Sequence, residues 1–180
     1  AAITRYVDKE DNAEYVYSLF VPSDASTAFP VFDQPDLKAR FKLILNVPEK
    51  WKAVSNERVK FFITRIEENN RGGKESTGYE FEETKPISTY VFTFAAGDFV
   101  EFEDKDASLE NALTEKLFDP YKKDTQKQKT SEPSGLFVVS NIYVRKSQAE
   151  KFKQHAAEVF RLNREGVKFL EDWFDYKFPF

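Results

Sequence analysis

The strictest pattern in the sequence is a ten-residue alternation of apolar and polar side chains over residues 38–47. One face is apolar and the other is mostly polar: the first holds Ala39, Phe41, Leu43, Leu45 and Val47, and the second holds Arg40, Lys42, Ile44 and Asn46. A period of two is typical of a strand with one buried and one solvated face, as in antiparallel sheets. The alternation therefore predicts a half-buried antiparallel strand.

Six further segments have strand-like patterns: 14–21, 51–55, 59–66, 77–83, 88–102 and 137–145. The segment 77–83 carries charges and a lone glycine, which suits an edge strand. Within 88–102, Gly97-Asp98 predicts a bulge or bend. Phenylalanine occurs 19 times, as expected where sheets pack through large faces. We predict a mainly β fold, with antiparallel or mixed sheets forming a sandwich.

Two segments have a helical pattern. Residues 106–118 place leucines at a spacing of four, which predicts a short helix within a surface insertion over 103–135 that we expect to be partly mobile. Ser147 to Glu150 fits a capping box. The apolar stripe after it predicts one continuous helix of about 27 residues. The stripe consists of Phe152, Ala156, Val159, Phe160, Val167, Leu170 and Phe174.

Charge and hydropathy argue against two classes of partner. The net charge is −4, and acids and bases are interspersed, which is not a polyanion-binding pattern. The lysines at 122, 123, 127 and 129 have acids nearby and Tyr121 as the one stacking aromatic, so they indicate a solvated loop. No apolar run approaches the ~20 residues that span a bilayer. We expect no nucleic-acid partner and no membrane span, and the sequence indicates no compartment.

The residues that catalysis needs are scarce. Zinc hydrolases use about three protein ligands, usually with histidine among them, and this chain has one histidine, His155, and no cysteine. The H-E-x-x-H motif needs two histidines, and no serine lies in a G-x-S-x-G turn. We expect His155 to be a surface or partly buried helix residue. The sequence thus predicts no catalytic residue, no metal site and no cofactor within these residues.

Four segments, taken together, resemble one enzyme family. Residues 23–41 contain Phe29-Pro30-Val31-Phe32-Asp33-Gln34-Pro35, close to the motif "DAR-x-x-FPCFDEP-x-x-KA-x-F". Residues 85–99 contain Pro86-Ile87-Ser88-Thr89-Tyr90, similar to "PMSTYL…VGDF", and 51–56 fit "W-x-A-x-SN". Residues 143–180 resemble the stretch from "Y-x-R" to "YFG-x-x-YP". The chain is therefore identified as a member of the aminopeptidase N / leukotriene A4 hydrolase family of zinc metallopeptidases.

The resemblance implies that this chain is part of a longer hydrolase with separate β and catalytic domains. In that family an N-terminal β domain precedes a thermolysin-like catalytic domain. Residues 1–145 would be part of the β domain, and 146–180 would be the first helix of the catalytic domain. The missing initiator methionine fits a fragment cut from a parent enzyme. Zinc and the peptide substrate would belong to the parent, and the rest of the parent polypeptide would be the partner of this chain. These residues would form a non-catalytic scaffold beside the substrate cleft.

The resemblance transfers few functional residues. The family position that holds the substrate's α-amine falls on Val21, which cannot accept a charged hydrogen bond. We expect the signature residues to be structural: Phe29, Pro30, Phe32, Asp33, Pro35, Lys38, Ser88, Thr89, Tyr90, Gly97 and Arg145. Phe29, Phe32 and Phe41 are core candidates, and we expect Asp33 to hydrogen-bond backbone. The alternative to a scaffold is a free-standing β-sandwich module that binds protein or carbohydrate through exposed aromatic residues.

Overall fold

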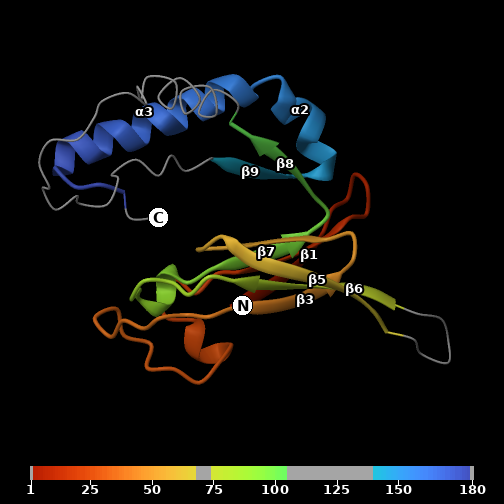
Figure 1. The fold of residues 1–180 in the computed structure, drawn as a ribbon, viewed down its shortest axis with the longest axis horizontal. Coiled ribbons are helices and arrows are strands. Elements are labelled where there is room, and N and C mark those ends of the chain that lie inside the picture. The colour runs from red at the N-terminus through yellow and green to blue at the C-terminus, as the bar shows by residue number, and fades with distance from the viewer. Residues whose placement is uncertain (1, 68–73, 105–139, 179–180) are drawn as a thin grey trace, which may run out of the picture. The chain divides into compact units, whose positions relative to one another are not determined.

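The computed structural model describes residues 2–67, 74–104 and 140–178. It divides into two compact units, each described by itself below. Unit 1 comprises Ala1–Val100, Arg145–Ala149 and Phe178–Phe180, and unit 2 comprises Glu101–Val144 and Glu150–Lys177. Figure 1 labels the helices and strands and draws the remaining residues as a thin grey trace.

Unit 1 contains a four-stranded antiparallel sheet in the order β1-β2-β7-β4. Its strands are β1 (Ile3–Val7), β2 (Glu14–Ser18), β7 (Phe94–Gly97) and β4 (Lys52–Ser55). Tyr15 of β2 lies opposite Gly97 of β7, and Ala53 of β4 lies opposite Ala96. Small residues along β7 leave room for the larger side chains of its neighbours. The antiparallel pairing of these strands confirms the predicted antiparallel β fold.

A second sheet of unit 1 joins β3 (Ile44–Pro48), β6 (Lys74–Phe81) and β5 (Val59–Glu67) in the order β3-β6-β5. The prediction that 77–83 is an edge strand is wrong, because β6 lies between the other two strands. Its glycine has a packing role instead: a Cβ on Gly78 would lie 2.9 Å from Asn46 Oδ1 on the neighbouring strand. The lone glycine therefore marks a close cross-strand contact rather than a sheet edge.

The alternation over 38–47 is confirmed in its phase but not in its length. Val47 is buried and Leu45 half-buried, while Ile44 and Asn46 are exposed. The strand β3 begins only at Ile44, and Ala39, expected on the buried face, is exposed and forms an isolated bridge with Ile87. Before Ile44 the regular ladder ends: the Phe81 amide still donates to the Leu43 carbonyl at 3.0 Å, but β6 itself ends at Phe81.

The aromatic segment 88–102 is not a single strand. It begins with a 3-10 turn, η2 (Thr89–Val91), continues as β7, and after Asp98 becomes β8 (Phe99–Glu103), which pairs with β9 (Asn141–Arg145). The bend predicted at Gly97-Asp98 is the point of division. Two successive strands that pair with different partners need such a break, because one straight strand cannot stay in both sheets.

Two clusters of apolar side chains form the core of unit 1. The first gathers Ala2, Phe20, Ala25, Ile87 and Phe92, and the second gathers Val47, Ala53, Phe81 and Ala96. Aromatic stacking fills the first cluster: the rings of Phe41 and Phe92 lie 4.3 Å apart and nearly parallel. Phe29, Phe41 and Phe92 thus pack together in the first cluster.

The predicted C-terminal helix is present but interrupted. A 3-10 turn, η3 (Lys146–Gln148), leads into α2 (Ala149–Lys153), and α3 (Ala156–Phe174) follows after a break. His155 N donates to Phe152 O at 2.8 Å, a three-residue spacing that tightens the last turn of α2, and His155 then precedes α3. The prediction of one continuous helix is therefore wrong at Gln154 and His155.

Polar contacts secure α3 within unit 2. Arg164 pairs with the buried carboxylate of Asp104, and Asn163 Nδ2 donates to Ser140 Oγ at 3.2 Å. The short helix predicted at 106–118 lies outside the described residues, as does nearly all of the insertion predicted at 103–135. Among the helices that the structure does describe, none has the length and apolar character that a bilayer span requires.

Candidate functional site

The first two signature segments meet through Asp33. Its Oδ2 accepts from the backbone amide of Ser26 at 3.3 Å, and its Oδ1 accepts from the hydroxyl of Thr89 at 2.5 Å. The hydroxyl of Ser88 donates to the carbonyl of Pro35. The expected backbone bond of Asp33 is confirmed, whereas the contact with buried Thr89 was not foreseen. The two segments, far apart in sequence, are held together by buried hydroxyl groups.

The remaining residues of the first signature segment divide between core and surface. Phe29 packs edge-on against Phe20, with ring centroids 5.6 Å apart. Phe32 is 81% exposed, so its assignment to the core is wrong. A tight path fixed by two flanking prolines turns its side chain outward. The other signature residues on the exposed surface are Pro30, Pro35, Lys38 and Tyr90.

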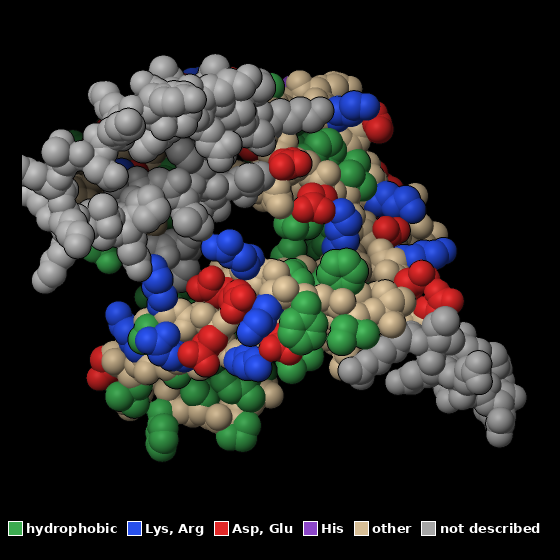
Figure 2. Space-filling view, viewed as in Figure 1, with side chains coloured by type: hydrophobic (Ala, Val, Ile, Leu, Met, Phe, Trp, Pro, Cys, Tyr) green, Lys and Arg blue, Asp and Glu red, His purple; other side chains and the backbone are tan. Residues whose placement is uncertain are grey.

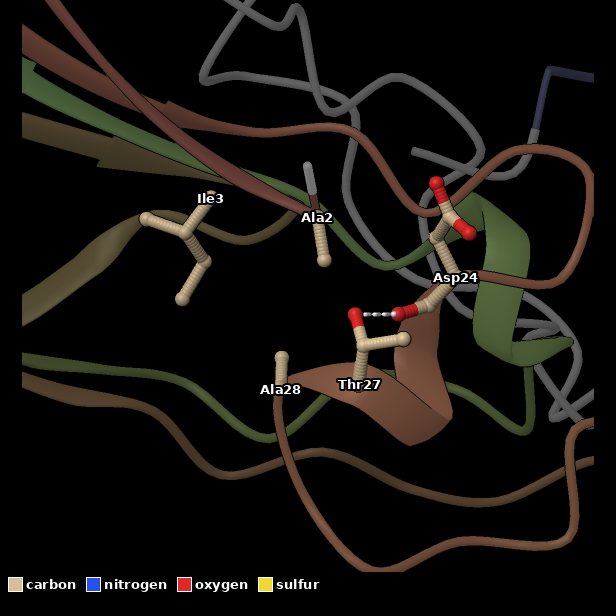
Figure 3. A pocket seen from close by; sticks show the side chains of 5 residues that line it. All are labelled: Ala2, Ile3, Asp24, Thr27 and Ala28. Carbon is tan, nitrogen blue, oxygen red and sulfur yellow. Dashed lines mark hydrogen bonds between the residues drawn. The ribbon is translucent and has the colours of Figure 1, made fainter.

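Val21 lies on the surface just after β2. Its side chain is 51% exposed and apolar, so it offers no acceptor to an amine. A hollow of the surface is lined by Ala2, Ile3, Asp24, Thr27 and Ala28 and has a volume of about 450 Å³ (Figure 3).

This hollow lacks the groups that covalent or acid–base catalysis requires. Asp24 is its one ionisable residue, and the hydroxyl of Thr27 donates to the Asp24 carbonyl at 2.7 Å, as the dashed line in Figure 3 marks. A nucleophile needs an adjacent base, and the lining supplies none beside Thr27. The hollow is therefore a gap between the start of β1 and the turn η1 (Ala25–Thr27).

A zinc ion does not fit the described part of the chain. Within the described ranges, no three His, Cys, Asp or Glu residues gather as a metal ion would need. His155 is exposed at the start of α3. Figure 2 shows acidic and basic side chains intermingled on the visible face, without a large area of one sign. This agrees with the interspersed charges of the sequence.

The last two signature residues belong to a polar cluster that sequence reasoning missed. Gly97 lies against the ring of Tyr15, and Arg145 Nη1 donates to Tyr6 Oη at 2.8 Å and to Asp8 Oδ2 at 3.1 Å. Asp8 is almost completely buried. A hydrogen bond from the Glu10 amide lowers the pKa of the Asp8 carboxyl, and the Ser147 hydroxyl and the Arg145 charge lower it further.

The pKa of the neighbouring Tyr15 hydroxyl moves in the opposite direction to that of Asp8. The pKa of Tyr15 is raised, chiefly by burial, although a hydrogen bond from the Lys146 amide acts in the other direction. Ser147, expected to cap a helix, instead donates its hydroxyl to Asp8. The sequence marks this cluster only by the charged run of residues 8–11, which follows β1. Such a run indicates an exposed turn more readily than a buried carboxylate.

Comparisons with known proteins agree with the signature segments. The family model for the peptidase M1 N-terminal domain matches residues 2–91. Aminopeptidase N of Streptomyces lividans is 32% identical over 176 residues, covering 98% of this chain and 16% of that protein. Probable M1 family aminopeptidase 1 of Encephalitozoon cuniculi is 38% identical over 97 residues, or 53% of this chain and 10% of that protein.

A leucyl aminopeptidase of Saccharolobus solfataricus is 38% identical over 92 residues, which are 51% of this chain and 11% of that protein. The chain therefore spans a small part of the length of these relatives, at most 16%. The matched region contains the Asp33 contacts and most strands of unit 1. The chain belongs to the M1 peptidase family, and residues 2–91 carry the N-terminal domain of that family.

Proposed function

We propose that these 180 residues act as a non-catalytic scaffold within a zinc-dependent aminopeptidase that removes N-terminal residues from peptides. The observation that carries the proposal is the alignment with an aminopeptidase N over 98% of this chain but 16% of the relative's length. A stretch of that extent leaves room for the catalytic groups elsewhere in a longer polypeptide.

The chemistry of the described residues supports a scaffold. The expected amine-binding position is the apolar Val21, and the single histidine, His155, is exposed. The signature residue Asp33 accepts hydrogen bonds from Ser26 and Thr89 and has no reacting group beside it in the described part of the chain. We infer that the signature residues hold the β region in shape, in agreement with a structural role.

The proposal assigns zinc, peptide substrate and water activation to other segments of the parent. When bound, zinc would lower the pKa of a water molecule and polarise the scissile carbonyl. Within this chain, residues 1–145 would supply the β wall beside the substrate cleft, and 146–180 would begin the catalytic domain. The rest of the parent polypeptide would be the partner of this chain.

The complete gene tests the proposal. A reading frame that continues from Phe180 into G-x-M-E-N and H-E-x-x-H, with a product that hydrolyses aminoacyl 4-nitroanilides and is blocked by a chelator, is the expected result. A stop codon immediately after Phe180 would contradict it and would favour the alternative, a free-standing module that binds protein or carbohydrate. Glycan and peptide arrays would then identify the ligand.

A further inference from the structure

A short segment of unit 1 is tied to a distant hairpin by a buried carboxylate. Arg145–Ala149 belongs to unit 1, although the residues on both sides of it belong to unit 2. The hairpin is the turn between β1 and β2, where Asp8 follows the last residue of β1. We call Arg145–Ala149 the strap and call Asp8, Arg145 and Ser147 the clasp.

Three hydrogen-bond donors hold the carboxylate of Asp8. Oδ1 accepts from the Glu10 amide at 3.0 Å, and Oδ2 accepts from Arg145 Nη1 at 3.1 Å and from Ser147 Oγ at 2.8 Å. The side chain of Asp8 is only 4% exposed. A buried charge with several donors is held firmly, because it has no water to replace a donor that moves away.

Two tyrosines of the hairpin strands add to the hold on the strap. Tyr15 Oη accepts from the Lys146 amide at 3.0 Å and donates to the Asp98 carbonyl at 3.1 Å. Tyr6 Oη accepts from Arg145, whose guanidinium also lies 5.0 Å from the centre of the Tyr6 ring. The strap is thus fixed through the Lys146 backbone amide and through side chains that include Arg145 and Ser147.

We propose that the clasp holds the strap closed on the β1–β2 hairpin, and that releasing Asp8 frees Arg145–Ala149 while the rest of unit 1 stays folded. Asparagine at position 8 would keep the shape of the side chain but replace one acceptor oxygen by an amide donor. That donor would then face either the Glu10 amide or the Arg145 and Ser147 donors, and one contact would be lost.

Hydrogen bonds from the Glu10 amide and the Ser147 hydroxyl, with a smaller contribution from the Arg145 charge, favour the ionised form of Asp8. Besides Arg145, the clasp is flanked by Glu10, which accepts from Gln148, by Lys146 paired with Asp98 at 3.2 Å, and by Asp11 and the two tyrosines. The pKa of Asp8 is lowered in the folded protein. Its contribution is therefore complete above the ordinary aspartate pKa and is lost as the pH falls through the folded pKa. The clasp therefore holds the strap more firmly at neutral pH than in acid.

Limited trypsin digestion at neutral pH tests the clasp, because the strap contains Arg145 and Lys146. Cleavage after each would be timed by mass spectrometry in the wild type, Asp8→Asn and the matched control Asp11→Asn, which removes an exposed carboxylate from the same turn. The expected result is cleavage on the order of tenfold faster in Asp8→Asn alone, the factor for one charge-assisted hydrogen bond. Equal rates in all three proteins would overturn the proposal.

A milder variant covers the case in which Asp8→Asn unfolds throughout, seen as lost far-ultraviolet dichroism and cleavage at many sites. Ser147→Ala removes one hydroxyl and leaves Asp8 ionised. Hydrogen exchange at the Lys146 amide would then report on the strap. The clasp predicts faster exchange there than in the wild type, with unchanged exchange in β4. Unchanged exchange at Lys146 would refute the role of the clasp.

Discussion

Alanine at position 97 would place a methyl group where the ring of Tyr15 already lies. A Cβ built on Gly97 would be 2.3 Å from Tyr15 Cδ1 and 3.0 Å from the Glu14 carbonyl oxygen. The two strands are paired at this point, with Tyr15 opposite Gly97. Tyr15 is 2% exposed, so its ring has little free space into which it can move. Either the ring or the β2–β7 pairing must shift.

Two costs add up to the expected loss of stability. Overpacking a dense core costs about 1–3 kcal/mol. Moving the ring also strains or breaks the bonds of Tyr15 Oη to the Lys146 amide and the Asp98 carbonyl, each worth about 1 kcal/mol. We expect Gly97→Ala to lower the free energy of unfolding by about 2–5 kcal/mol, a large part of the roughly 5–15 kcal/mol of a typical domain.

Urea denaturation followed by circular dichroism measures the loss. Gly166→Ala is the matched control, because this helical glycine has nothing within 4 Å of a built Cβ. Glycine in an exposed helix costs about 1 kcal/mol relative to alanine, so the control should raise stability by up to that amount. The same substitution is thus predicted to act in opposite directions at two positions.

A double variant separates the ring clash from other effects. If the methyl group meets the Tyr15 ring, Tyr15→Leu combined with Gly97→Ala should cost clearly less than the sum of the two single losses. Full additivity would show that the clash lies elsewhere. A Gly97→Ala protein whose stability is within about 0.5 kcal/mol of the wild type would refute the reasoning altogether.

Three further predictions concern single side chains. Phe81→Ala, at a residue 1% exposed in the second core cluster, should cost about 3–5 kcal/mol in the same denaturation assay, and a loss under about 1 kcal/mol would contradict the core assignment. Thr89→Val should destabilise unit 1 by about 1–3 kcal/mol because Asp33 loses a buried donor, whereas Thr89→Ser should be nearly neutral; equal losses would exclude that hydrogen bond as the cause. The Glu49 carboxylate raises the pKa of Glu75, first through a hydrogen bond and then through charge repulsion, so ionised Glu75 weakens the folded state. Glu75→Gln should therefore raise the melting temperature at pH 7, and this gain should vanish below the ordinary glutamate pKa. A gain in melting temperature that persists in acid would contradict the pairing of Glu49 with Glu75.

Local patterns predicted the strands better than their partners. Alternation placed Leu45 and Val47 on the buried face, because a period of two reports which side of a strand meets the core. It could not reveal that β6 would be central, since strand order depends on pairing between distant segments. Phe32 failed for a related reason: hydrophobicity favours burial, but the path of an irregular segment decides where the side chain points.

The signature contacts were predicted in part. Asp33 between two prolines indicated backbone hydrogen bonding, which the Ser26 amide confirms. Its contact with Thr89 joins residues 56 positions apart, and no local pattern encodes such a distance. The contacts of the clasp are even harder to predict from sequence, because Asp8 and Arg145 are separated by 137 positions. Resemblance to a family selected Arg145 without identifying its partner.

We propose that this chain is a scaffold without catalytic groups of its own. The most direct test of this proposal is the hydrolysis of an aminoacyl 4-nitroanilide by the purified 180-residue chain, with and without added zinc. The account predicts no turnover above the background rate in either condition. Turnover that is lost on adding a chelator and restored by zinc would contradict it, because a metal-dependent site would then exist within these residues.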